Sequence, residues 1–237
     1  MKMGMKAPIK VLLLMLTMAH AAAAAEGYSV AVEVKLLRSD NQQPLKDLSK
    51  SVVWLVPTRG DFRIRTKDDP HFRMVQKGKK FEPDLLIVPA GSFVDFPNMD
   101  PWFHNVFSLF QGKRFDLGLY QAGTQRSVRF DRPGVSYLFC NIHPEMSSVV
   151  LAVESNWYGT SDSKGVVTLT NVPEGRYVMH VWHENSSSES PGQTQKVIEV
   201  TGDRKLSPIT LMIHPQNHNH KNKYGNDYDP DALKPEY

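Results

Sequence analysis

The sequence predicts an all-β protein that contains two β-sandwiches. Short runs rich in Val, Ile, Phe and Tyr recur along most of the chain, and Gly-, Pro- and Asp-containing turns separate them. No segment has the 3.6-residue apolar period of a long helix. Short strands with frequent turns are typical of sandwiches and Greek-key barrels.

The predicted strands begin with a clear alternation, in which Val30, Val32 and Val34 share one face. The full set in chain order is 28–37, 51–56, 85–88, 92–96, 105–109, 127–130, 135–139, 148–153, 166–170, 177–182, 196–200 and 209–213. Residues 58–70, of mixed charge, are predicted to be a connecting loop.

The first 25 residues have the order of a secretory signal peptide. Lys2, Lys6 and Lys10 precede the apolar run VLLLMLTMA, and small residues follow, with predicted cleavage after Ala21 or Ala25. The apolar run is shorter than the ~20 residues that cross a bilayer. We therefore expect an exported, periplasmic protein without membrane insertion after cleavage.

The balance of basic and acidic residues argues against a nucleic-acid partner. The chain has 28 lysines and arginines against 25 acidic residues, and the three signal lysines account for that whole excess. The remaining chain is balanced, so the sequence predicts no nucleic-acid partner.

One loop carries the chemistry. The chain has a single cysteine, Cys140, in FCNIHPEM (139–146), together with His143 and Met146. A thiol that cannot form a disulfide within its chain is an oxidation liability in an exported protein unless something occupies it. Thiolate, imidazole and thioether together suit copper. The best candidate for a further histidine ligand is His104, in NMDPWFHNVFS between two predicted strands.

These pieces resemble the cupredoxins, the family of amicyanin and plastocyanin. The resemblance covers residues 70–153 and rests on LLIVPAGSFVDFPNMD, FHNV and GVSYLFCNIHPEM. It implies a Greek-key sandwich with one type 1 (blue) copper, held equatorially by His104, Cys140 and His143 and axially by Met146. It also implies that Asn105 braces the ligand loop and hydrogen-bonds near the thiolate.

The remainder resembles a carboxypeptidase-regulatory, transthyretin-like sandwich. That resemblance rests on WYGTSDSKGVVTLTNVPEGRYVMHVWHE. Such a sandwich needs earlier strands, so we expect 26–58 and 154–213 to form one discontinuous module with the cupredoxin unit inserted; the alternative is a linear order of modules. Residues 214–237 lack apolar periodicity and are predicted to be a disordered tail.

The remaining histidines are interpreted as packed or exposed residues. His180 and His183 lie on opposite faces of one strand, and they lack the spacing of a zinc motif. His71 is interpreted as structural or exposed.

The leading functional prediction is a periplasmic blue-copper carrier of single electrons that docks a redox partner protein. A filled ligand set leaves no open position for substrate, so an enzyme is not predicted. Two alternatives stay open: a binding module in which copper is structural or absent, and a copper storage or delivery protein. The expected docking surface is apolar and consists of Met99, Pro101, Trp102, Pro144 and Phe103.

Overall fold

The computed structural model describes residues 27–59, 70–109, 112–186, 194–214 and 221–228. Within these ranges the secondary structure is β throughout, arranged in several sheets, which confirms the predicted class. The predicted signal segment and most of the 58–70 loop lie outside the described residues. The described ranges also contain no helix with the length and apolar character needed to cross a bilayer.

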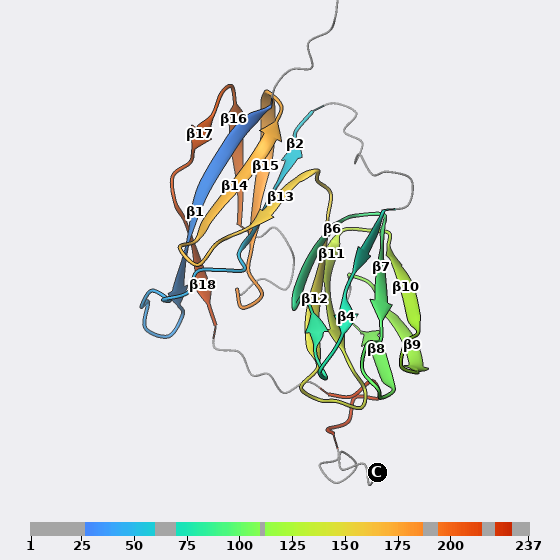
Figure 1. Cartoon of the computed structure of the whole chain (residues 1–237). Helices are drawn as coiled ribbons and strands as arrows, with labels where there is room; N and C mark the ends of the chain where they lie inside the picture. The colour runs from blue at the N-terminus through green and yellow to red at the C-terminus, as the bar shows by residue number, and fades with distance from the viewer. Residues whose placement is uncertain (1–26, 60–69, 110–111, 187–193, 215–220, 229–237) are drawn as a thin grey trace, which may run out of the picture.

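Ten of the strands form a central module (Figure 1). They are β3 (His71–Arg73), β4 (Val75–Gln76), β5 (Phe81–Glu82), β6 (Leu85–Pro89), β7 (Ser92–Pro97), β8 (His104–Ser108), β9 (Phe115–Tyr120), β10 (Gln125–Phe130), β11 (Gly134–Phe139) and β12 (Ser147–Val153). The main sheet has the order β6-β12-β11-β8-β9, and a second has the order β10-β7-β3. The inward-facing residues of both sheets form one apolar core that includes Phe96, Leu138 and Val150.

The other strands form a second module, named here the split sandwich because its strands come from both sides of the central module. They are β1 (Tyr28–Arg38), β2 (Val52–Pro57), β13 (Trp157–Thr160), β14 (Val166–Val172), β15 (Gly175–Trp182), β16 (Thr194–Val200), β17 (Arg204–Lys205) and β18 (Ile209–Ile213). In one sheet β1 pairs with β14, β17 and β18; in the other the order is β13-β2-β15-β16. Its likeness to transthyretin stays a prediction.

The two modules share a buried apolar interface. Trp54 and Trp182 of the split sandwich belong to the same cluster of buried residues as Val149 and Leu151 of the central module. The alternation of strand residues explains this arrangement. In β12, for example, Val150 faces the core of the central module while its neighbours Val149 and Leu151 face the other module.

Most of the predicted strands occur within one or two residues of their predicted bounds. The longest strand that the sequence does not predict is β9, FDLGLY, which pairs with β8. Gly118 interrupts its apolar run at a positive φ of 65°, and the mixed burial of the strand leaves no clean alternation.

Residues 221–228 lie within the tail that composition predicts to be disordered. These residues form a hydrogen-bonded turn that contacts the central module, through Lys223 to Asn141 and through Tyr228 to Cys140. The contacts are polar, and they leave no apolar pattern in the sequence. Residues 215–220 and 229–237 lie outside the described ranges.

Candidate metal centre

The candidate ligand loop joins two neighbouring strands of the main sheet. Cys140 follows the last residue of β11, and Met146 precedes the first residue of β12. Two backbone hydrogen bonds close the loop: the Cys140 N–H donates to the Met146 carbonyl at 3.2 Å, and the Met146 N–H donates to the His143 carbonyl at 3.0 Å. The loop is therefore a tight turn whose ends are fixed by the β11–β12 pairing.

The sheet also brings His104 to this loop. His104 is the first residue of β8, which pairs with β11. Its Nδ1 lies 3.9 Å from the Cys140 Sγ, and the His143 Nδ1 lies 3.6 Å from the same sulfur. One ligand atom from each of the three side chains lies within 4.8 Å of the others.

These separations fit a single bound metal ion. Thiolate and imidazole ligands lie about 2.0–2.3 Å from a divalent ion such as zinc, so two such ligands at tetrahedral or trigonal angles lie about 3.5–3.8 Å apart. Of the two sulfur–nitrogen distances around Cys140, 3.6 Å lies within this range and 3.9 Å lies just above it. The backbone folding thus brings the three predicted equatorial residues together in a metal-binding arrangement.

Met146 ends the same loop. It is fully buried, as are His104 and Cys140, and its side chain belongs to the same apolar cluster as Cys140. His143 is the exception because it is only half-buried. The resulting set of His104, Cys140, His143 and Met146 resembles a type 1 copper site.

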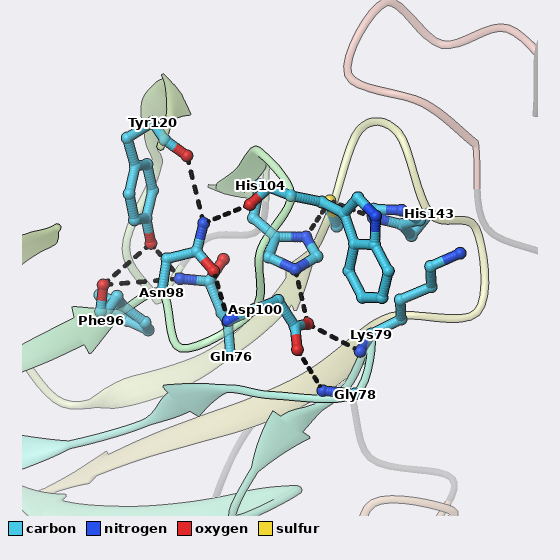
Figure 2. A network of polar contacts seen from close by, with 11 residues as sticks. Gln76, Gly78, Lys79, Phe96, Asn98, Asp100, His104, Tyr120 and His143 are labelled. Atoms are coloured by element: carbon cyan, nitrogen blue, oxygen red, sulfur yellow. Dashed lines mark hydrogen bonds and ion pairs between the residues drawn. The ribbon is translucent and has the colours of Figure 1, made fainter. Parts of the chain in front are cut away.

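Asp100 orients the buried histidine (Figure 2). Its Oδ2 lies 2.8 Å from the His104 Nε2, while Oδ1 and Oδ2 accept hydrogen bonds from the backbone N–H groups of Gly78 and Lys79 at 2.6 and 2.9 Å. A carboxylate beside Nε2 favours the tautomer with its proton there, which leaves the Nδ1 lone pair directed toward the sulfur of Cys140. The carboxylate therefore prepares His104 to bind a metal through Nδ1.

The environment of Asp100 keeps it ionised. Burial raises the pKa of its carboxyl group, but the N–H groups of Lys79 and Gly78 and the ring of His104 outweigh burial and hold this pKa below its usual value. The side chain of Asn98 stabilises the same turn, because it accepts from the Asp100 N–H at 3.0 Å and donates to the Trp102 carbonyl at 2.7 Å. Neither residue is predicted from the sequence, in which their only signal is the pair of turn-forming side chains in NMDPWFH.

Two opposing influences act on the pKa of the Cys140 thiol. Burial raises its pKa, while the backbone N–H groups of Asn105, Ile142 and His143 lie against the sulfur and lower it. Burial has the larger effect, so the pKa of the metal-free thiol is raised. The N–H groups direct partial positive charge at the sulfur, so the site can accommodate a thiolate once a cation binds and displaces the proton.

Solved structures that resemble this protein match the fold of part of the chain. No protein-family model and no curated protein matches the sequence. Among solved structures, a Cu-containing nitrite reductase from Thermus scotoductus SA-01 is 23% identical, with a TM-score of 0.35, over 42% of this chain and 25% of its own. A purple cupredoxin from Nitrosopumilus maritimus is 22% identical, with a TM-score of 0.31, over 34% of this chain and 98% of its own. Amicyanin from Paracoccus versutus is 20% identical, with a TM-score of 0.33, over 38% and 86%. We infer the metal centre from the side chains of this chain alone.

The backbone of Asn105 hydrogen-bonds near the thiol, as the resemblance to cupredoxins implies, whereas its side chain contacts β9. Its side-chain amide donates to the Asp116 Oδ1 at 2.7 Å, while its backbone N–H faces the Cys140 sulfur. Asp116 also accepts from the Lys223 ammonium group at 2.8 Å. Asn105 therefore links the thiolate region to β9 and, through Asp116, to the C-terminal segment.

The other histidines of the described strands lie outside this cluster. His180 stacks on Trp54 with ring centroids 4.9 Å apart, and His183 is buried. His71 pairs with Asp95 at the surface, with 2.9 Å between Nδ1 and Oδ2. Within the described ranges, the group of His104, Cys140 and His143 is the one set of three or more His, Cys or acidic side chains close enough to share an ion.

Replacing Asp100 by asparagine will weaken Cu(II) binding by about 10- to 100-fold, the usual effect of removing a partner that orients a ligand. Asp100 receives hydrogen bonds on both oxygens from N–H donors, so the amide NH2 of an asparagine would face a donor. Competition with a chelator measures this change. The matched control is Asp131→Asn, which removes an exposed ion pair with Lys113 and leaves the affinity unchanged. Equal affinities for Asp100→Asn and wild type would show that this carboxylate does not orient His104.

Proposed function

We propose that this protein is a periplasmic carrier of single electrons that binds one type 1 copper ion. The observation on which this proposal rests is the meeting of His104, Cys140 and His143 around one point, with sulfur–nitrogen distances of 3.9 and 3.6 Å. When bound there, copper supplies a one-electron couple between Cu(II) and Cu(I). The periplasmic location rests on the predicted signal segment alone.

The donor types favour copper over other ions. Soft thiolate and thioether ligands disfavour Mg²⁺ and Ca²⁺, which prefer oxygen, and a His₂Cys set with a nearby methionine is typical of electron-transfer copper. The chain holds these donors on rigid strands and in a closed loop, so little rearrangement accompanies a change of oxidation state. With four side chains around one ion there is no position for a substrate, and we propose no catalytic role.

His143 offers the route for the electron. His104, Cys140 and Met146 are fully buried, whereas His143 is half-buried and so reaches toward solvent. Apolar side chains are exposed in the segment that leads to His104: Met99 is 59% exposed and Phe103 is 55% exposed. An exposed apolar surface at this end of the module suits a transient redox partner, since such encounters use small interfaces.

The chain that follows the predicted signal segment has balanced numbers of basic and acidic residues, which does not favour strong long-range steering of a partner. Lys113, a candidate for local steering, pairs with Asp131 at 2.7 Å. Lys79 lies over the ring of Trp102, with 5.1 Å between its Nζ and the ring centroid, so it is a local cation beside the apolar surface. Trp102 is half-buried and therefore available to contribute to that surface. The proposed partner is accordingly a protein with an apolar docking face.

Electron self-exchange between oxidised and reduced copies tests this proposal without a known partner. If two copies meet through this surface, Phe103→Glu places like charges opposite each other and slows self-exchange by about tenfold or more. The rate is measured from NMR line broadening in mixtures of the two oxidation states. The visible spectrum should be unchanged, because Phe103 is largely exposed.

Leu109→Glu is the matched control. Leu109 is 49% exposed and follows the last residue of β8, whereas Phe103 precedes its first residue, so the two positions lie at opposite ends of one strand. This substitution should leave the self-exchange rate unchanged. Equal slowing by both variants would indicate a general charge effect and would exclude the proposed docking surface.

A further inference from the structure

We propose that the C-terminal segment 221–228 is a positioning element of the metal centre, which holds the ligand loop in its metal-binding conformation from outside. This inference rests on the proposed copper site. The segment follows β18 of the split sandwich in the chain, yet it lies beside the ligand loop of the central module (Figure 1).

Three of the hydrogen bonds between described residues link the segment to the centre. The Tyr228 hydroxyl donates to the backbone carbonyl of Cys140 at 2.9 Å. The Lys223 N–H donates to the Asn141 Oδ1 at 3.0 Å, and the Lys223 ammonium group donates to the Asp116 Oδ2 at 2.8 Å. Two of these contacts hold the first two residues of the ligand loop, and the third holds the carboxylate that binds Asn105.

The segment has local structure that prepares it for these contacts. The Asn222 side chain accepts from the backbone N–H groups of Tyr224 and Asn226 at 3.0 and 3.1 Å. The Gly225 N–H donates to the Asn222 carbonyl at 2.9 Å, and Gly225 has a φ of 80°, which favours glycine. This turn presents Lys223 and Tyr228 to the central module in fixed positions.

The physical effect concerns the position of the sulfur. Cys140 has its side chain toward the proposed metal and its carbonyl toward Tyr228, so a bond to the carbonyl restrains the peptide that carries the ligand. Asn105, which directs its N–H at the sulfur, is restrained in the same way through Asp116 and Lys223. Loss of these bonds would let the loop open more often and would change the hydrogen bonding around the sulfur.

Thiol labelling of the metal-free full chain tests this inference without copper. Cys140 is fully buried, so its reaction with a disulfide reagent such as Ellman's reagent reports opening of the loop. Tyr228→Phe removes one hydroxyl and should speed labelling about two- to tenfold, the range expected for one hydrogen bond. Lys223→Met should act in the same direction, and the double variant should react faster than either single variant.

The copper-loaded variants supply a second readout. Tyr228→Phe and Lys223→Met should shift the reduction potential and the thiolate-to-Cu(II) absorption band, which a role limited to stability would not move. Asn226→Ala is the matched control: Asn226 lies in the same turn, is exposed, and hydrogen-bonds to Asn222 through its backbone, so its variant should behave as wild type in both assays.

The outcomes separate this inference from the proposed function. A wild type that binds Cu(II) without a thiolate absorption band overturns the copper site itself. A blue wild type whose Tyr228 and Lys223 variants keep its labelling rate, potential and band overturns the positioning role. Lower thermal stability with unchanged labelling and potential also overturns it, because it would indicate a structural role only.

Discussion

Replacing Cys140 by serine will abolish the intense thiolate-to-Cu(II) absorption that we expect from the loaded protein, and will weaken Cu(II) binding about a hundredfold. Four-ligand structural sites bind zinc with about 10–16 kcal/mol, so loss of one ligand costs about 3 kcal/mol, or about a hundredfold. The thiolate is also the group whose charge transfer produces the colour, and a hydroxyl cannot replace it.

The fold should survive this substitution. Serine has nearly the shape of cysteine, and the N–H groups of Asn105, Ile142 and His143 that lie against the sulfur can donate to the new hydroxyl. Visible absorption measures the colour, copper stoichiometry measures metal binding, and far-UV circular dichroism measures the fold. His71→Ala is the matched control, because His71 lies outside the cluster, and it should leave the colour intact. A blue Cys140→Ser variant, or a wild type that binds one Cu(II) tightly without colour, would contradict the proposed site.

Replacing Trp182 by alanine will lower the free energy of unfolding by about 3–5 kcal/mol, the usual cost of removing a large buried aromatic side chain. Trp182 is 1% exposed and lies in the interface between the modules, with Val149 and Leu151 opposite. Its loss leaves a cavity between two rigid sheets that cannot collapse easily. Urea denaturation followed by far-UV circular dichroism gives the free energy and its dependence on urea.

The same experiment tests whether the modules unfold together. A packed apolar interface couples them, so wild type should show one transition, while Trp182→Ala should broaden or divide that transition. Val197→Ala is the matched control on the adjacent strand β16, because Val197 is 51% exposed and its loss should change stability by less than about 0.5 kcal/mol. A loss below about 1 kcal/mol for Trp182→Ala would show that the two sheets are not tightly packed.

The sequence alone was sufficient for most of the longer strands, though not for β9, and for the donors of the ligand loop. Residues Tyr28–Arg38 alternate between buried and more exposed positions because one face of the strand lies on the core, and this two-residue period is visible in the sequence. The three donors of FCNIHPEM are separated by two residues each, so a single turn can gather them whatever the rest of the fold does.

The partner of His104 required the tertiary structure. Asp100 approaches the ring only because Asn98 holds the intervening turn and because Gly78 and Lys79, some 20 residues earlier, donate to its carboxylate. Such contacts depend on single polar atoms meeting at defined distances, and they produce no periodic pattern. For the same reason, composition predicted disorder for a tail in which Lys223 and Tyr228 hydrogen-bond to the metal-site region.

At the interface between the modules, too, the sequence indicates which residues are buried, and the tertiary structure decides what covers them. The run VVWLV in β2 indicates a strand that is buried on both faces, since neighbouring residues point in opposite directions. Only the fold decided what covers each face: Val53 and Leu55 pack within the split sandwich, while Val52 and Trp54 pack against the central module. Local patterns report whether a side chain is buried because burial depends on its polarity, but the identity of the covering residues depends on how distant segments pair.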